Sequence, residues 1–188
     1  MLALEARRVC IALLIVCSGV ARAWASASAD SPLPGPGTVR LFSISKSENK
    51  NQVEYAIRVN EHCAPIGDAP VFGYWRMLEK GPAYAEPLLA REVPGYGLLG
   101  QRVTARDSDG GQVRITLRAL PAREILVEVR RDQTGQCRAW STISIQGAPS
   151  YLYNVFVRLT WPFARVDYLL LQGWSLDGTR VVTEKLKP

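Results

Sequence analysis

Apolar and polar residues alternate with a period of two along most of this chain. The stretches 52–59 (QVEYAIRV) and 113–119 (VRITLRA) show the pattern most clearly. Such alternation is typical of β-strands with one buried and one exposed face. The same reasoning predicts further strands, for about nine in all, at residues 39–45, 71–78, 124–130, 140–145, 151–160, 165–174 and 179–186.

Turn-forming residues separate these stretches. Glu48-Asn49-Lys50-Asn51, Asp109-Gly110-Gly111 and Asp177-Gly178 are polar or glycine-rich, and Trp161-Pro162 interrupts a longer apolar run. Short strands joined by tight turns predict an all-β, antiparallel meander. A closed barrel and a two-sheet sandwich would both protect its edges and would both produce this alternation, so the sequence leaves that choice open.

The segment 79–104 is the least strand-like part of the chain. Its residues 83–91 are the one stretch for which a helix is predicted, although Pro87 lies inside it. A connection of this length in a compact domain is typically a functional loop or a lid.

The N-terminus has the organisation of an export signal. Arg7 and Arg8 precede an apolar run at 9–20, and Ala27-Ser28-Ala29 fits the small-residue cleavage pattern. We therefore expect a signal peptide at 1–29, a Pro/Gly linker at 30–37 and a single domain at 38–188. Earlier cleavage or an uncleaved anchor remain alternatives. After residue 30 no apolar run reaches the length of a membrane span, so no span is expected in the mature chain.

The cysteines support export. Cys63 and Cys137 remain after cleavage after Ala29, and an even number of cysteines in an exported chain favours a disulfide. Two unrelated buried thiols are the alternative. The predicted location is periplasmic or secreted.

Composition and charge exclude several classes of protein. A hydrophobic content of 47% is too high for a disordered chain. The formal net charge of +6 comes from dispersed basic residues, and Arg130-Arg131 is followed at once by Asp132. A nucleic-acid partner is therefore not expected, because it would require a basic stripe.

The usual catalytic and cofactor motifs are missing or lie in the wrong context. His62 is the sole histidine, and its neighbour Cys63 would point to the opposite face of an extended chain. The 95–100 segment (GYGLLG) matches a dinucleotide fingerprint but lacks the flanking strand and helix. Residues 107–111 (DSDGG) begin like a calcium loop without its later glutamate. No metal and no cofactor are predicted.

Several short motifs carry a resemblance to a known family. They are Leu41-Phe42-x-Ile44, Ser47-x-Asn49-Lys50-Asn51-x-Val53-x-Tyr55, Pro70-Val71-x-x-Tyr74-Trp75 and Tyr96-Gly97, followed by Gly173 and Gly178. Over residues 39–186 the chain resembles the bacterial family called domain of unknown function 4833. The resemblance implies an exported or envelope-associated β-rich domain and brings no known activity or catalytic residue.

The sequence thus favours a non-catalytic binding or structural module of the cell envelope with an unknown envelope ligand or protein as partner. Asparagine and lysine side chains offer hydrogen-bond donors, and aromatic rings offer flat apolar contact. The candidate binding residues are Lys46, Asn49, Lys50, Asn51, Tyr74, Trp75 and Tyr96. Two alternatives stay open: a small-ligand carrier with an interior cavity, and an enzyme using Glu48, Glu54 or Glu92 as acid and base.

Overall fold

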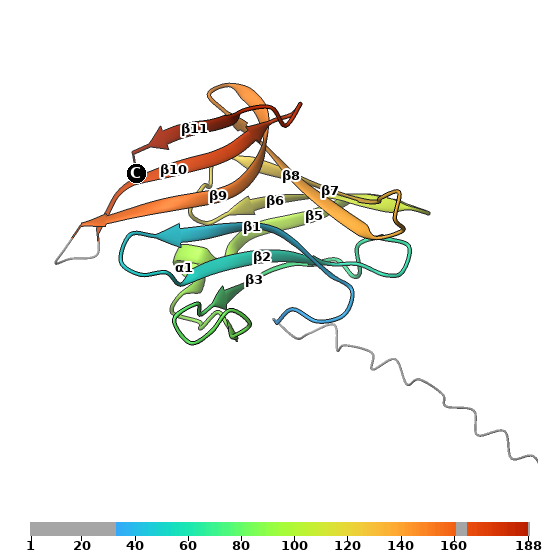
Figure 1. The fold of residues 1–188 in the computed structure, drawn as a ribbon, viewed down its shortest axis with the longest axis horizontal. Helices are drawn as coiled ribbons and strands as arrows, with labels where there is room; N and C mark the ends of the chain where they lie inside the picture. The colour runs from blue at the N-terminus through green and yellow to red at the C-terminus, as the bar shows by residue number, and fades with distance from the viewer. Residues whose placement is uncertain (1–32, 161–164, 188) are drawn as a thin grey trace, which may run out of the picture.

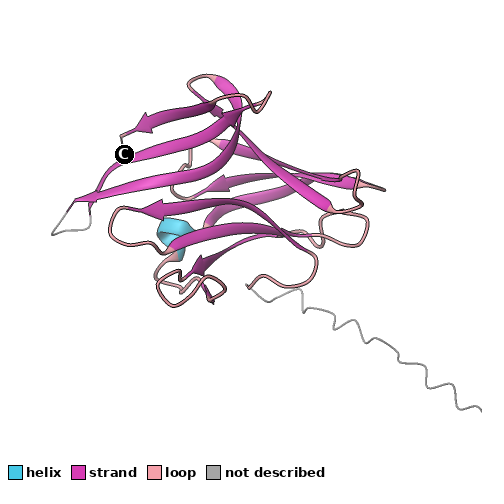
Figure 2. Cartoon of the chain, in the orientation of Figure 1, coloured by secondary structure: helices cyan, strands magenta, loops and turns pink. Residues whose placement is uncertain are grey.

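Strands make up nearly all of the regular structure. The computed structural model describes residues 33–160 and 165–187, so the predicted signal peptide and Trp161-Pro162 lie outside the described residues. Figure 2 shows strands throughout and a single short helical turn. The strands are β1 (Thr38–Lys46), β2 (Gln52–Arg58), β3 (Val71–Arg76), β4 (Ala85–Pro87), β5 (Leu98–Asp107), β6 (Gly110–Leu117), β7 (Glu124–Arg131), β8 (Cys137–Ile145), β9 (Ala148–Thr160), β10 (Arg165–Ser175) and β11 (Val181–Leu186), and the helix is α1 (Val93–Tyr96).

The prediction of an all-β fold is confirmed, with two local differences. The helix predicted at 83–91 is wrong, because this segment contains the short strand β4 and α1 begins only at Val93. The long strand β5 was not predicted. It alternates only between half-buried and exposed positions, which leaves little hydrophobic signal in its sequence.

Two antiparallel meanders meet at β9 (Figure 1). The strand order is β4-β3-β2-β1-β9-β8-β7-β6-β5, and β10 and β11 continue from the other edge of β9. The first part of β9 pairs with β8, and its Asn154 to Val157 stretch runs parallel to β1. This parallel pair is the exception to the predicted antiparallel meander. It joins segments more than 100 residues apart, which no local pattern could indicate.

The sheet is not closed into a barrel, and its inner faces share one core. Phe42 and Tyr55 stack there with ring centroids 4.7 Å apart, and the apolar residues of β6 to β9 face them. The gap between β3 and β5 is bridged by a side chain. The Gln101 amide accepts a hydrogen bond from the Val71 N–H at 2.9 Å and donates one to the Val71 carbonyl at 3.0 Å. Of the two predicted closures, the open strand order therefore fits the sandwich.

The predicted disulfide is present. Cys63, in the loop between β2 and β3, is bonded to Cys137 at the start of β8. The same loop is held by two arginines: Arg131 donates to the Glu61 carbonyl, and Arg106 donates to the carbonyls of Pro65 and Gly67. The loop thus ties the first meander to the second at the end opposite the β1–β2 turn.

Candidate binding pocket

One surface pocket gathers several of the predicted residues at the end where β1 and β3 finish. Figure 1 shows the β1–β2 turn and α1 at this end of the molecule. The pocket has a volume of about 270 Å³ and is open to solvent. It is lined by Lys46, Asn49, Asn51, Trp75, Met77, Glu86, Pro87, Leu89, Arg91 and Glu92.

Trp75 forms the wall on the core side and is fixed by its neighbours. It is 8% exposed, and its indole Nε1 donates to Glu92 at 2.8 Å. The same carboxylate oxygen accepts from the Leu89 N–H at 2.8 Å, which folds the 88–92 segment against the indole. Tyr96 packs edge-on against Trp75 at 5.3 Å. A tryptophan held by both its polar and its apolar edges is preorganised to present its remaining surface to a ligand.

The two asparagines shape the pocket rim. Asn51 is buried and exchanges hydrogen bonds with Glu79, donating to its carboxylate at 3.1 Å and accepting from its N–H at 3.2 Å. The Asn49 side chain accepts from the Asn51 N–H at 3.1 Å and so holds the β1–β2 turn. Both amides therefore have structural partners as well as a position on the pocket wall.

The charges of the pocket are unevenly satisfied. Glu86 is paired with Lys80 at 2.6 Å, and this hydrogen bond lowers the pKa of the Glu86 carboxyl. Lys46 lies 5.3 Å above the Trp75 ring and 3.6 Å from Glu48. Among the residues that the structure describes, Arg91 forms no ion pair. The pocket therefore combines an apolar wall with two cationic groups, Lys46 beside Glu48 and Arg91. The Glu92 carboxylate on the same wall is compensated by its two N–H donors, from Trp75 and Leu89.

Three of the predicted residues lie elsewhere or behind the pocket. Tyr96 supports Trp75, and burial raises the pKa of its hydroxyl, with smaller contributions from Glu48 and Glu92. Lys50 is exposed at the tip of the turn and is not among the lining residues. Tyr74 is on the opposite face of β3, because successive residues of a strand point to opposite sides.

Tyr74 belongs to a buried polar cluster around Glu54. The Glu54 side chain is 5% exposed and lies 3.1 Å from Arg76 and 3.5 Å from Arg40. The Tyr74 hydroxyl donates to Glu54 at 2.6 Å. Burial, followed by this contact with the carboxylate, raises the pKa of Tyr74 to about 12. The arrangement is that of a satisfied structural ion pair, with the carboxylate held by two cations.

The candidate acid–base carboxylates do not face one another. Glu54 is on the outer face of β2, opposite Tyr74 in the register, whereas Glu92 contacts Trp75 on the other face. Glu48 lies in the exposed β1–β2 turn. Of these three, only Glu92 lines the pocket, and the other carboxylate on the pocket wall, Glu86, is paired with Lys80.

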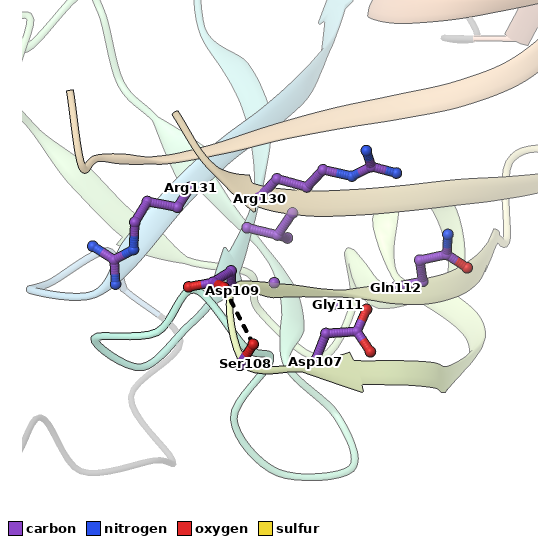
Figure 3. A pocket seen from close by; sticks show the side chains of 9 residues that line it. Asp107, Ser108, Asp109, Gly111, Gln112, Arg130 and Arg131 are labelled. Carbon is purple, nitrogen blue, oxygen red and sulfur yellow. Dashed lines mark hydrogen bonds between the residues drawn. The ribbon is translucent and has the colours of Figure 1, made fainter. Parts of the chain in front are cut away.

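The other sequence motifs have plain structural roles. Residues 107–111 form the tight β5–β6 turn, and Figure 3 shows the Asp107 and Asp109 side chains leaving it in different directions, with Ser108 donating to Asp109 at 3.2 Å. Gly97 ends α1, where a Cβ would come within 2.6 Å of the Val93 carbonyl. His62 is exposed beside Glu61. Within residues 33–160 and 165–187 no group of three potential metal ligands occurs.

Sequence reasoning missed half of the pocket wall. Met77, Glu86, Pro87, Leu89 and Arg91 all come from the 77–92 region. For all of them except Met77, which falls in the strand predicted at 71–78, the available signal was the expectation that 79–104 is a functional loop. That expectation names the segment without its individual residues. The side chains that meet Trp75 depend on β4 pairing with the end of β3.

Comparison with known proteins gives one match. The family model described as "Domain of unknown function (DUF4833)" matches residues 42–185. No curated protein and no solved structure matches the chain. In the described part of the chain, no helix has the length and hydropathy of a membrane span.

Proposed function

The chain belongs to the DUF4833 family, and from that premise we propose that it is a non-catalytic binding module of the cell envelope. The pocket bounded by Trp75, Lys46 and Arg91 is its ligand site. The observation that carries the proposal is the convergence of the β1–β2 turn, the end of β3 and the 86–92 segment on one indole ring.

The disulfide supports a location outside the cytosol. Structural disulfides persist in the periplasm and in secreted proteins, whereas cytosolic thiols are kept reduced. The bond between Cys63 and Cys137 joins the β2–β3 loop to the first residue of β8, two segments that the sheet itself does not pair. It therefore fits a domain that completes its folding after export to the periplasm or the medium.

The pocket favours a small anionic group attached to an apolar body. The Trp75 ring, Met77 and Leu89 supply apolar contact, and Lys46 and Arg91 supply positive charge. Ligand sites of this kind combine an apolar lining with a few placed polar groups. A volume of about 270 Å³ suits a small molecule or the end of a peptide. A free C-terminal carboxylate next to an apolar side chain has this chemistry.

Two observations favour a binding module over a small-ligand carrier and over an enzyme that uses carboxylates. A carrier would enclose its ligand, and this pocket is open to solvent. A carboxylate enzyme would need two free carboxyls across the substrate, and both carboxylates of this pocket are engaged: Glu86 pairs with Lys80, and Glu92 accepts hydrogen bonds from Trp75 and Leu89.

We expect N-acetyl-leucine and N-acetyl-phenylalanine to bind at this pocket. In a two-dimensional ¹H–¹⁵N NMR titration, the indole N–H of Trp75 and the amides of the β1–β2 turn should shift most. Lys46→Met and Arg91→Met should each weaken binding about fivefold or more, because each removes a charge-assisted contact. The probes should be recovered unchanged.

The matched control is Lys50→Met, which removes the same charge at the tip of the adjoining β1–β2 turn, outside the pocket wall. It should leave binding unchanged. Equal losses from Lys50→Met and Lys46→Met, or no shifts with any carboxylate probe, would contradict the assigned pocket. Chemical conversion of a probe would contradict the non-catalytic role.

A further inference from the structure

The outer face of the sheet carries a second hollow, independent of the Trp75 pocket. It has a volume of about 590 Å³ and is lined by Arg40, Leu41, Ser43, Tyr153 and Trp174. Ser43 is directly opposite Glu54 in the β1–β2 register, and Glu54 is opposite Tyr74. Cross-strand partners share a face, so this groove lies on the side of the sheet away from Trp75.

Two β-bulges border the groove. In β1 the register shifts between Arg40 and Ser43, so that one extra residue is accommodated there. The extra residue brings the side chains of Arg40 and Ser43 to the same groove, although residues three apart in a regular strand would point to opposite faces. In β9 the register with β10 shifts at Tyr153, which has no direct partner between Leu152 and Asn154. Bulges commonly re-aim side chains beside binding sites.

Two aromatic rings lie exposed in the groove. Tyr153 is 37% exposed and Trp174 is 42% exposed, and their ring centroids are 6.2 Å apart. They come from β9 and β10, which are paired and lie side by side (Figure 1). The two rings pack against each other, and a large part of each ring is in contact with water. Neither ring belongs to the hydrophobic core, so packing of the core does not explain their position.

The polar side of the groove is fixed by hydrogen bonds. Ser43, buried on the groove wall, donates to Asn154 at 3.0 Å, and Asn154 donates to Ser45 at 2.9 Å and to Gln172 at 2.8 Å. Each member of this network constrains the next. The groove wall is therefore preorganised and would lose little conformational entropy on binding.

The charge at the groove is positive. Arg40 is 58% exposed, and its Nε lies 3.5 Å from Glu54. Glu54 is shared with Arg76 at 3.1 Å, so one carboxylate serves two guanidinium groups. The Arg40–Glu54–Arg76 cluster keeps one unit of positive charge, and Arg40 presents it at the groove.

We propose that this groove binds an anionic sugar chain. A pyranose ring has an apolar face of C–H groups that stacks on an aromatic ring, and a rim of hydroxyls that exchange hydrogen bonds with polar side chains. Tyr153 and Trp174 provide the stacking surface, Ser43 provides a hydroxyl at the wall, and Arg40 pairs with a carboxylate or phosphate on the sugar. An apolar protein surface would not use the excess charge of Arg40, so the charge favours the glycan.

The test is a glycan array probed with the purified domain. The array carries uronic-acid oligosaccharides, phosphate-bearing oligosaccharides and neutral oligosaccharides of matched length. The domain should bind the uronic-acid oligosaccharides, the phosphate-bearing oligosaccharides or both more strongly than the neutral ones. Comparison of the two anionic sets identifies the acidic group that Arg40 recognises. It should weaken as sodium chloride is raised from 50 to 500 mM, since exposed charge pairs are screened. Absence of binding to every anionic glycan would overturn the proposal.

Variants locate the site. Trp174→Ala and Tyr153→Ala should each weaken binding to the best glycan about tenfold. Arg40→Met should remove the preference for anionic over neutral glycans, and Arg40→Lys should restore part of it. Tyr84→Ala, at an exposed tyrosine outside the groove, is the matched control and should change nothing.

Two results would overturn the assignment even if a glycan binds. One is an equal loss of affinity in Tyr84→Ala and Trp174→Ala. The other is a change of oligomeric state in Trp174→Ala by light scattering, which would show that the aromatic pair contacts a second copy of the chain. Unchanged melting temperatures in all variants establish that the fold is intact.

Discussion

Replacing both Cys63 and Cys137 with alanine is expected to lower the free energy of unfolding by about 4 kcal/mol. The bond links residues 74 apart in the sequence, so its loss releases a long loop in the unfolded chain. In the folded state it connects the β2–β3 loop to β8, across the two meanders. Equilibrium urea unfolding of the oxidised protein and the double-alanine variant measures the difference.

Reducing the wild-type protein under the same conditions supplies the control. Reduction breaks the same cross-link and adds only one hydrogen to each sulfur. The loss of unfolding free energy on reduction should therefore agree with the loss in the double-alanine variant. A loss below about 1 kcal/mol in both samples would show that Arg131 and Arg106 hold the loop without the disulfide.

Replacing Arg76 with methionine is expected to cost about 3 kcal/mol of unfolding free energy. Glu54 is 5% exposed, and Arg76 contacts its carboxylate more closely than Arg40 does, at 3.1 Å against 3.5 Å. Without Arg76 the buried carboxylate keeps the Tyr74 hydroxyl, a long hydrogen bond from the Gln52 amide at 3.4 Å, and the more distant, exposed Arg40. Leaving a buried charge short of partners costs far more than breaking a solvated pair. Urea unfolding again provides the measurement.

The matched control is Arg114→Met, which breaks the exposed Arg114–Glu124 pair. That pair is shorter, at 2.6 Å, but both side chains are more than 40% exposed, and its loss should cost less than about 1 kcal/mol. The double variant Glu54→Gln with Arg76→Met should recover part of the lost stability, because it also removes the buried charge. If Arg76→Met costs no more than Arg114→Met, Glu54 is not held as described.

The fold class could be predicted from the sequence because burial follows the side-chain alternation. Strands such as β6 can be predicted directly from the pattern, since its buried and half-buried positions alternate from Gly111 onward. The parallel contact of β1 with β9 could not be predicted, since it depends on two segments that are distant in the sequence and on the way β9 changes partner from β8 to β1. The short β4 contains Pro87 and exists through its pairing with the end of β3.

The site was predicted only in part, for related reasons. Lys46, Asn49, Asn51 and Trp75 meet at one pocket, since a hairpin turn and the end of the adjacent strand lie close in any antiparallel meander. Tyr74 was grouped with Trp75 by sequence, but neighbouring strand residues face opposite ways. Glu54 looked like a solvent-facing position of an alternating strand. It is buried because Tyr74, Arg76 and Arg40 converge on it from the two strands beside β2.

The most direct test of the central claim, that this is an exported β domain closed by a disulfide, is the intact mass of the protein recovered from fractionated cells. The account predicts a chain beginning at Asp30, found in the periplasm or medium, with Cys63 and Cys137 oxidised. A full-length chain in the cytosol with both cysteines reduced would contradict it.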